Sequence, residues 1–237
     1  MNRAVFLDRD GVIIRTDVRA QTCAMESLMP LPHWMRWRFW TAPGTPSSGS
    51  RTPVSFEVFA DEFDEMEHQA LEIASWGDNV NVKIPITNSR CESAVPLVER
   101  LTAKGVVVNV TAMFTLDQVR SVIDVLDPGT PAILSVFAGR VADSGRDPVP
   151  HMMEVVDIAK AKPKSEVLWA SPRELLNIFQ ADEVGCHINT VTNDVIKKLS
   201  NVGKDLGEFS LETVKMFYDD AAAAGYAIDM TETDAAE

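Results

Sequence analysis

The stretch Asn79-Val-Asn-Val-Lys-Ile-Pro85 decides the fold, because polar and apolar side chains alternate along it with the period of a β-strand. Its three aliphatic side chains point to one face, and Asn81 and Lys83 point to the other. An open sheet covered by helices on both faces is expected to have nearly continuous apolar strands, whereas a barrel gathers polar strand-end residues around one axis. The same inward polar pattern recurs in neighbouring predicted strands, at Ser55, Glu57, Asn109, Thr111 and Ser135.

Strands and helices alternate outward from this stretch. From about residue 54 onward, short β-branched runs are followed by amphipathic helical segments, which is typical of parallel strands joined by crossover helices. Six such units can be counted, and an apolar run at 4–7 predicts a seventh strand. Seven strands suit an open doubly wound sheet as well as a barrel, and the inward polar side chains favour an α/β fold of the (β/α)₈ or TIM barrel class. The six predicted strands are 54–60, 79–84, 106–111, 132–137, 166–170 and 186–191.

Charge and composition divide the chain into four segments. Of the net charge of −13, residues 12–53 contribute +3, from five arginines and two acids, and residues 1–11 contribute none. Residues 12–53 also hold five of the thirteen prolines and a cluster of Trp and Phe, with no sustained helical or strand period. We therefore predict a first strand within 1–11, an irregular junction over 12–53, a barrel over 54–228 and an acidic tail over 229–237.

Length and composition narrow the classes of function. A chain of 237 residues suits one barrel domain. Its negative charge disfavours nucleic acid and membrane surfaces as partners, and no apolar run approaches the roughly 20 residues that cross a bilayer. The first residues lack the long apolar centre of a secretory signal, so a cytoplasmic location is expected. The three cysteines form no CxxC pair and the four histidines show no metal-ligand spacing, so no metal site is expected.

Lys83 is the first lysine of the chain and lies inside a predicted strand, where its burial needs an explanation. One interpretation is structural: the ammonium pairs with Glu57, since buried charges are usually paired. The other is chemical: burial disfavours the charged ammonium, and the free amine can attack a carbonyl and form an imine, or Schiff base. The residues themselves leave both interpretations open.

An imine allows a carbon–carbon bond to break only if nearby groups move protons. Glu57 and Thr111, inward on the preceding and following strands, form a candidate acid/base pair around a water. Asn109 and Ser135 are candidates for orienting substrate hydroxyls. Each of these residues taken alone is more often an ordinary polar core residue, and their combination around Lys83 is what indicates chemistry.

An anion site is predicted at the mouth of the barrel, where the C-terminal ends of the strands meet. Arg140 and Arg173 follow two of these strands, and Ser171 precedes a helix start. Guanidinium groups, a hydroxyl and a helix N-terminus suit phosphate, and barrels bind phosphate at this end, so a sugar phosphate is the implied substrate. The nearby cluster of Asp143, Arg146 and Asp147 is interpreted as loop salt bridges without chemistry.

Four longer motifs occur in one order along the chain: VKIPITN at 82–88, VNVTAMFTLDQ at 108–118, SVFAGRVADSGRDP at 135–148 and LWASPRE at 168–174. Together they resemble the small transaldolase family, which includes the fructose-6-phosphate aldolase-like members, and the similarity runs over about 54–228. The resemblance implies a TIM barrel and a class I aldol mechanism without cofactor, in which a dihydroxyacetone unit passes between sugar phosphates.

The resemblance also implies a role for each site residue. Lys83 would form the Schiff base, with Glu57 and Thr111 positioning the catalytic water. The remaining residues would bind the substrate: Asn109 and Ser135 its hydroxyls, and Ser171, Arg173 and Arg140 its phosphate.

The N-terminus departs from this family. Transaldolases end their second strand with a Thr-Thr-Asn-Pro motif, which is absent from 12–53, so the barrel is expected to be incomplete at strand 2. The opening AVFLDRDGVI at 4–13 instead resembles the first motif of haloacid-dehalogenase-type sugar bisphosphate phosphatases. In that family Asp8 would be the nucleophile and Asp10 the acid/base, with Mg²⁺ between them.

Three functions therefore stay open. The first is a transaldolase or aldolase using Lys83, in which Asp8 supplies a substitute carboxylate from the first strand. The second is a Mg²⁺-dependent sugar-phosphate phosphatase using Asp8, and the third is a catalytically impaired barrel. An open barrel edge leaves part of the core exposed, so a homo-oligomer is expected.

Overall fold

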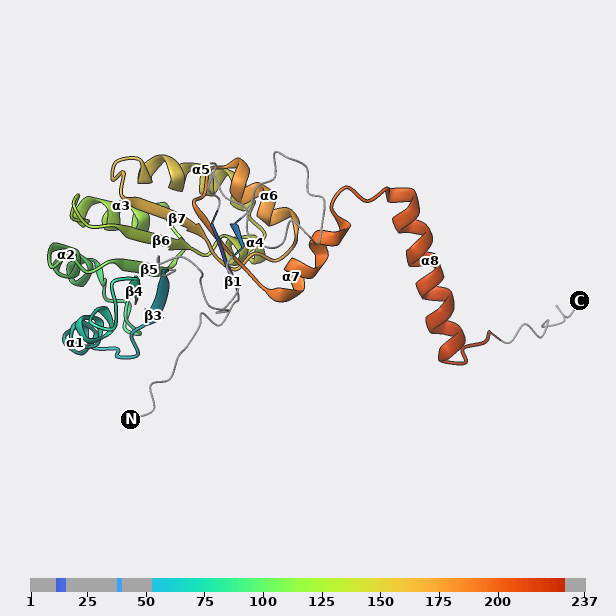
Figure 1. The fold of residues 1–237 in the computed structure, drawn as a ribbon, viewed down its shortest axis with the longest axis horizontal. Coiled ribbons are helices and arrows are strands. Elements are labelled where there is room, and N and C mark those ends of the chain that lie inside the picture. The colour runs from blue at the N-terminus through green and yellow to red at the C-terminus, as the bar shows by residue number, and fades with distance from the viewer. Residues whose placement is uncertain (1–11, 16–37, 40–52, 229–237) are drawn as a thin grey trace, which may run out of the picture. The chain divides into compact units, whose positions relative to one another are not determined.

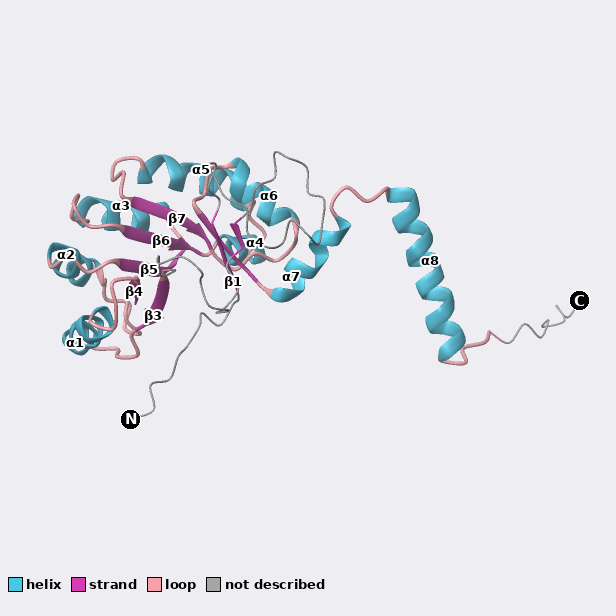
Figure 2. Ribbon diagram, viewed as in Figure 1, coloured by secondary structure: helices cyan, strands magenta, loops and turns pink. Residues whose placement is uncertain are grey.

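Six parallel strands form the larger part of an eight-stranded sheet in the computed structural model, which describes residues 12–15, 38–39 and 53–228. From β3 to β8 the order in the sheet follows the order in the chain, and the strands curve into a half-barrel with helices along its outer side (Figures 1 and 2). This confirms the predicted α/β fold of an incomplete (β/α)₈ barrel. The parallel strands are β3 (Val54–Glu57), β4 (Val80–Pro85), β5 (Val108–Met113), β6 (Ala132–Val136), β7 (Ser165–Trp169) and β8 (Ile188–Val191).

A helix follows each parallel strand, and local sequence explains where several of them begin. Thr115 and Gln118 form a capping box at the start of α3, and the Asp147 side chain accepts a hydrogen bond from the Val149 amide at the start of α5. The helices are α1 (Phe63–Ala74), α2 (Val95–Ala103), α3 (Leu116–Val125), α4 (Ala138–Asp143), α5 (Pro148–Ala159), α6 (Leu176–Glu183) and α7 (Asn193–Lys197).

Two apolar clusters lie on the two faces of the sheet. The larger cluster fills the space between strands and helices and includes Val82 and Ile84, as the alternation along β4 predicts. The smaller cluster consists of inward side chains, and the partly buried Phe137 ring packs against it from the end of β6. Its buried members are Ile133, Leu168, Ala170 and Ile188. The interior of the half-barrel is therefore a packed core below its mouth.

Short antiparallel strands extend the sheet beyond β8. Strand β1 (Val12–Arg15) pairs antiparallel with β8, and β2 (Arg38–Phe39) pairs with β1. Neither strand was predicted from the irregular composition of 12–53. Backbone pairing does not need side-chain periodicity, and an edge strand offers free N–H and C=O groups to any extended segment. The strand predicted at 4–7 lies outside the described residues.

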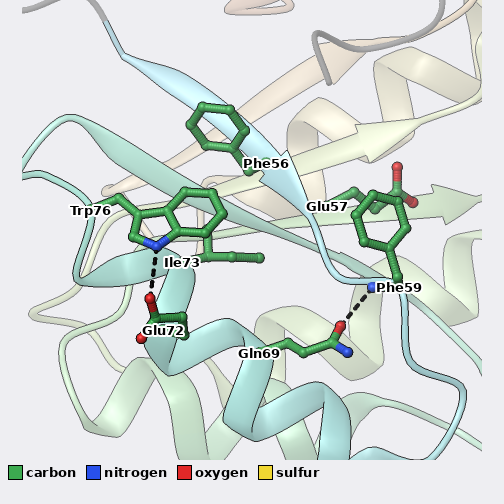
Figure 3. Close-up of a pocket in the computed structure, with 7 residues that line it drawn as sticks. All are labelled: Phe56, Glu57, Phe59, Gln69, Glu72, Ile73 and Trp76. Carbon is green, nitrogen blue, oxygen red and sulfur yellow. Dashed lines mark hydrogen bonds between the residues drawn. The ribbon is translucent and has the colours of Figure 1, made fainter. Parts of the chain in front are cut away.

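The other edge of the sheet is β3, and a hollow of about 160 Å³ lies between it and α1. The rings of Phe56 and Trp76 meet edge to face at the hollow, with centroids 5.3 Å apart. Figure 3 shows these rings and Ile73 on one side of the strand, with the Glu57 carboxylate pointing away from them. The Phe59 side chain, 74% exposed, also lines the hollow. The flank of α1 next to β3 is thus incompletely covered within the described part of the chain.

The residues after Lys197 form a separate unit. Its described part contains a 3₁₀ turn (Lys198–Asn201) and the helix α8 (Leu206–Ala223), which begins with the Asp205 side chain accepting from two backbone amides. No residue of α8 is buried. Across the described residues, no helix is both long and apolar enough to cross a membrane.

Candidate active site

Lys83 lies in the middle of β4 on the inner face of the sheet, and its side chain is 9% exposed. The strand register places it opposite Glu57 on β3 and opposite Asn109 on β5. Its Nζ atom lies 3.7 Å from Oε2 of Glu57, whose side chain is 45% exposed. A buried amine therefore has beside it a carboxylate that can exchange protons with solvent.

Asn109 and Thr111 line the same inner face, and both are buried. The Asn109 side-chain amide donates to the Ser55 hydroxyl at 3.1 Å. The Asn109 Oδ1 atom and the Thr111 hydroxyl are buried without a hydrogen-bond partner in the structure. A buried polar atom without a partner is costly, so these two atoms are suited to bind a substrate hydroxyl or a water.

Strand β5 is irregular where Thr111 stands. The pairing with β6 shifts between Val110 and Met113, and Ala112 has a φ of 58°. Left-handed backbone is uncommon for a residue with a side chain, and bulges of this kind redirect side chains at the rims of barrels. The local strain lies next to a candidate catalytic residue, where such strain is frequently found.

The end of β6 carries Ser135 and an aromatic platform. Ser135 is buried on the inner face, two positions before Phe137. The Phe137 ring lies 5.7 Å from the Phe114 ring, and the Arg140 guanidinium lies 5.0 Å from the Phe137 centroid. This stacking is a favourable cation–π geometry that favours one orientation of an exposed guanidinium.

The Ser171 turn packs directly against the start of α4. Ser171 is buried with a φ of 57°, and its amide donates to the Thr190 hydroxyl at 3.3 Å. The Gly139 amide donates to the Ala170 carbonyl at 3.1 Å, and a Cβ atom at Gly139 would lie 1.5 Å from the Ser171 carbonyl oxygen. Only glycine permits this approach, which holds the loops after β6 and β7 together.

Arg173 pairs with Asp143, the last residue of α4. Its Nε donates to Asp143 Oδ1 at 3.1 Å and its Nη2 donates to Oδ2 of the same carboxylate. Asp143 was expected to form loop salt bridges with its neighbours in sequence, and its partner in the structure is instead one of the predicted phosphate-binding arginines. The Arg173 amide also donates to Oδ1 of Asn177 at 2.7 Å.

The structure thus places the predicted residues in two groups. Lys83, Glu57 and Asn109 are neighbours across three adjacent strands, with Thr111 and Ser135 on the same inner face. The second group lies on the segments that follow β6 and β7 and contains Arg140 on α4, Ser171 and Arg173. Asp8 and Asp10 lie outside the described residues. Among the residues that are described, no three His, Cys, Asp or Glu side chains are grouped as metal ligands.

The sequence analysis did not single out Phe137 or Thr190, and it assigned Asp143 only to loop salt bridges. Phe137 stands two positions after Ser135, so strand alternation could have placed it on the inner face. Asp143 stands three positions after Arg140 on one helix, which places both side chains on one face. Thr190, which accepts from the Ser171 amide, lies on the neighbouring strand β8, nineteen residues later in the sequence, and no local pattern identifies it.

The curved parallel strands and their ring of inward polar side chains define a protein of the (β/α)₈ barrel class. A family model described as Transaldolase/Fructose-6-phosphate aldolase matches residues 19–236. The chain belongs to this family, as its motifs indicated. The match does not include residues 1–18, where the phosphatase-like motif lies.

Curated relatives agree with this assignment. A "Probable transaldolase 2" of Listeria monocytogenes is 35% identical over 150 residues, which are 62% of this chain and 64% of the relative. A "Probable transaldolase" of Streptococcus agalactiae is 33% identical over 150 residues (62% and 65%), and one of Dehalococcoides mccartyi is 35% identical over 147 residues (62% and 64%). The chain therefore spans slightly less than two thirds of the length of these relatives.

One solved structure, "PaMucR Phosphodiesterase, c-di-GMP complex", superposes with a TM-score of 0.38 at 11% identity, covering 59% of each chain. A likeness this slight has no bearing on the function.

Proposed function

We propose that the chain is a transaldolase or aldolase that acts on sugar phosphates through a Schiff base on Lys83. The observation that carries the proposal is the position of the Lys83 amine, buried on the inner face 3.7 Å from the Glu57 carboxylate. The family and the printed names of the relatives support the reaction class.

In the proposed reaction, the Lys83 Nζ attacks the ketose carbonyl and water leaves, which gives an iminium ion. Glu57 then takes a proton from a substrate hydroxyl through a water that it holds together with Thr111. This hydroxyl is on the carbon that becomes the aldehyde when the carbon–carbon bond breaks. The carbon–carbon bond then breaks, the iminium accepts its electron pair and becomes an enamine, and an aldehyde leaves. Attack of the enamine on a second aldehyde forms a new carbon–carbon bond and restores the iminium, and hydrolysis of that iminium completes transfer. Protonation of the enamine followed by hydrolysis completes simple cleavage.

The second group of residues would hold the phosphate of the substrate at the mouth. Arg140 is stacked on Phe137 and Arg173 is held by Asp143, so both guanidinium groups favour one orientation before substrate arrives. Binding energy from a remote phosphate can hold the carbonyl near the amine, because fixed orientation replaces a random encounter. This role explains why arginines are found at the mouth of an otherwise acidic chain.

Activity of the full chain tests the proposal. Wild-type protein is expected to release or transfer a three-carbon unit from fructose 6-phosphate, and Lys83→Arg is expected to abolish this while the far-ultraviolet dichroism stays unchanged. Arginine keeps the charge beside Glu57 but cannot form an imine at neutral pH. Full activity in Lys83→Arg would contradict the proposal. Phosphate release that persists in Lys83→Arg and is lost in Asp8→Asn would instead identify a phosphatase.

A further inference from the structure

The pair between Asp143 and Arg173 joins two loops at the mouth. Both side chains are about half exposed, at 50% and 48%. The carboxylate accepts from the Nε and the Nη2 edge of one guanidinium, so the plane of the guanidinium is fixed. An exposed ion pair adds little to the free energy of unfolding, so orientation is the larger effect of this contact.

The two loops that carry this pair are already rigid relative to each other. Gly139 at the start of α4 lies against the Ser171 carbonyl, and its amide donates to Ala170. Asp143 at the end of α4 and Arg173 after the Ser171 turn therefore stand on a fixed frame. Arg140 lies on the same six-residue helix, three residues before Asp143. One short helix thus carries one arginine of the anion site and the acid that holds the other.

We propose that Asp143 is a positioning residue that holds the Arg173 guanidinium in place for phosphate. This rests on the proposed function, in which the mouth binds the phosphate of the substrate. Two physical effects of Asp143 oppose each other. The negative charge of Asp143 weakens phosphate binding by repulsion. Its two hydrogen bonds to Arg173 strengthen phosphate binding, because the long arginine side chain is already ordered when the phosphate arrives. The proposal states that orientation is the larger effect.

Titration of inorganic phosphate into the full chain by calorimetry separates the two effects. Asp143→Ala is expected to weaken phosphate binding by about three- to tenfold, the gain expected from holding one long side chain in place. Tighter binding would show that Asp143 acts only by repulsion, and unchanged binding would show that it does not act on the site. Either result overturns the proposal, as does the absence of phosphate binding by the wild type.

Matched variants make this result specific. Asp157→Ala on α5 also removes one exposed carboxylate, which pairs with Lys160 just after the helix, and is expected to leave phosphate binding unchanged. In an Arg173→Ala background only the repulsion from Asp143 remains, so Asp143→Ala is expected to leave phosphate binding unchanged or to tighten it slightly. An undiminished weakening of binding there would overturn the proposal. If the Asp143→Ala variant does not fold, Asp143→Asn takes its place in the test. Asparagine keeps the size of the side chain but cannot accept both hydrogen bonds from the Arg173 guanidinium.

The test also distinguishes failure of this inference from failure of the proposed function. Trapping of dihydroxyacetone with borohydride reports the imine and needs no phosphate. Phosphate titration reports the mouth and needs no imine. Asp143→Ala is expected to raise KM for a phosphorylated ketose and to leave dihydroxyacetone trapping unchanged. Equal loss in both assays would indicate a general structural role and would contradict the inference.

Discussion

The pairing of Lys83 with Glu57 has two interpretations, and they predict opposite results for Glu57→Gln. If Glu57 moves protons, turnover is expected to fall by about 10²- to 10⁴-fold with little change in stability. If it only neutralises the Lys83 ammonium, its removal is expected to lower the free energy of unfolding by about 1–3 kcal/mol, less than for a fully buried pair because the Glu57 side chain is 45% exposed. We expect the first result, measured by steady-state kinetics and urea unfolding. Glu72→Gln is the control, because Glu72 binds the Trp76 indole on the other side of β3.

Two of the thiols differ in burial and therefore in expected reactivity. Cys91 is exposed, whereas Cys186 is 2% exposed and desolvation raises its pKa to about 12. Iodoacetamide at pH 8 is therefore expected to modify Cys91 in the folded protein and Cys186 only after unfolding, because the thiolate is the reactive form. Peptide mapping by mass spectrometry checks this, and rapid native labelling of Cys186 would contradict the described core.

The raised pKa of Cys186 makes the stability of the folded protein depend on pH. An unfolded thiol ionises near its ordinary value of 9.0 and the folded Cys186 thiol near 12, so the folded state favours the neutral form. The contribution of Cys186 to stability is fully present below pH 9 and is lost as the pH rises from about 9 to about 12. Cys186→Ala removes this dependence.

The close approach of α4 to the Ser171 turn depends on one glycine. Gly139→Ala would place a Cβ atom 1.5 Å from a backbone oxygen, so the two loops must separate. We expect a loss of about 1–3 kcal/mol of unfolding free energy, the usual cost of overpacking, together with weaker phosphate binding. Gly129→Ala is the matched control, because its Cβ meets only the Asp127 side chain, at 3.0 Å. Equal stability of the two variants, measured by urea unfolding, would contradict this packing.

The hollow between β3 and α1 is expected to bind an apolar dye. Phe59 lines it with a side chain that is 74% exposed, and incompletely covered apolar surface of this kind attracts apolar ligands. Phe59→Ser is expected to lower the fluorescence of bound anilinonaphthalene sulfonate. Leu176→Ser on α6, which removes a side chain that is 55% exposed, serves as the comparison. An equal decrease in both variants would show that the dye does not bind this hollow.

The elements show what sequence pattern can and cannot predict. All six parallel strands were predicted because their β-branched runs are buried by helices on the outer face, and inward Lys83 and Asn109 followed from alternation. Strand β1 was missed because its pairing with β8 depends on backbone groups, which leave no periodic trace in the sequence. The pairing of Arg173 with Asp143 was missed because it joins residues from different loops.

At the scale of the whole molecule, the homo-oligomer stays a prediction, and the exposed apolar side chains of α8 offer a way to test it. Val214 and Phe217 lie one turn apart and are 59% and 62% exposed. We expect the native mass to exceed that of one chain, and Val214→Ser with Phe217→Ser to lower it, because both remove apolar surface from one helix face. Light scattering after size exclusion measures this, with Tyr226→Ser beyond the helix as the control. A monomeric wild type would contradict the expectation.

The family and the barrel were both recognisable from the sequence because motifs at the strand ends follow one another in a fixed order. What the sequence could not provide is the distance between side chains on different strands. The 3.7 Å between Lys83 and Glu57 depends on the register of β3 and β4, which the hydrophobic pattern fixes only once the sheet has formed.

The central claim is that Lys83 forms an imine with a ketose. Incubation of the full chain with dihydroxyacetone and borohydride, followed by peptide mapping, tests it most directly. We predict one reduced three-carbon adduct, on the Nζ atom of Lys83, that is absent from Lys83→Arg. A folded protein whose Lys83 peptide stays unmodified under these conditions would contradict the claim.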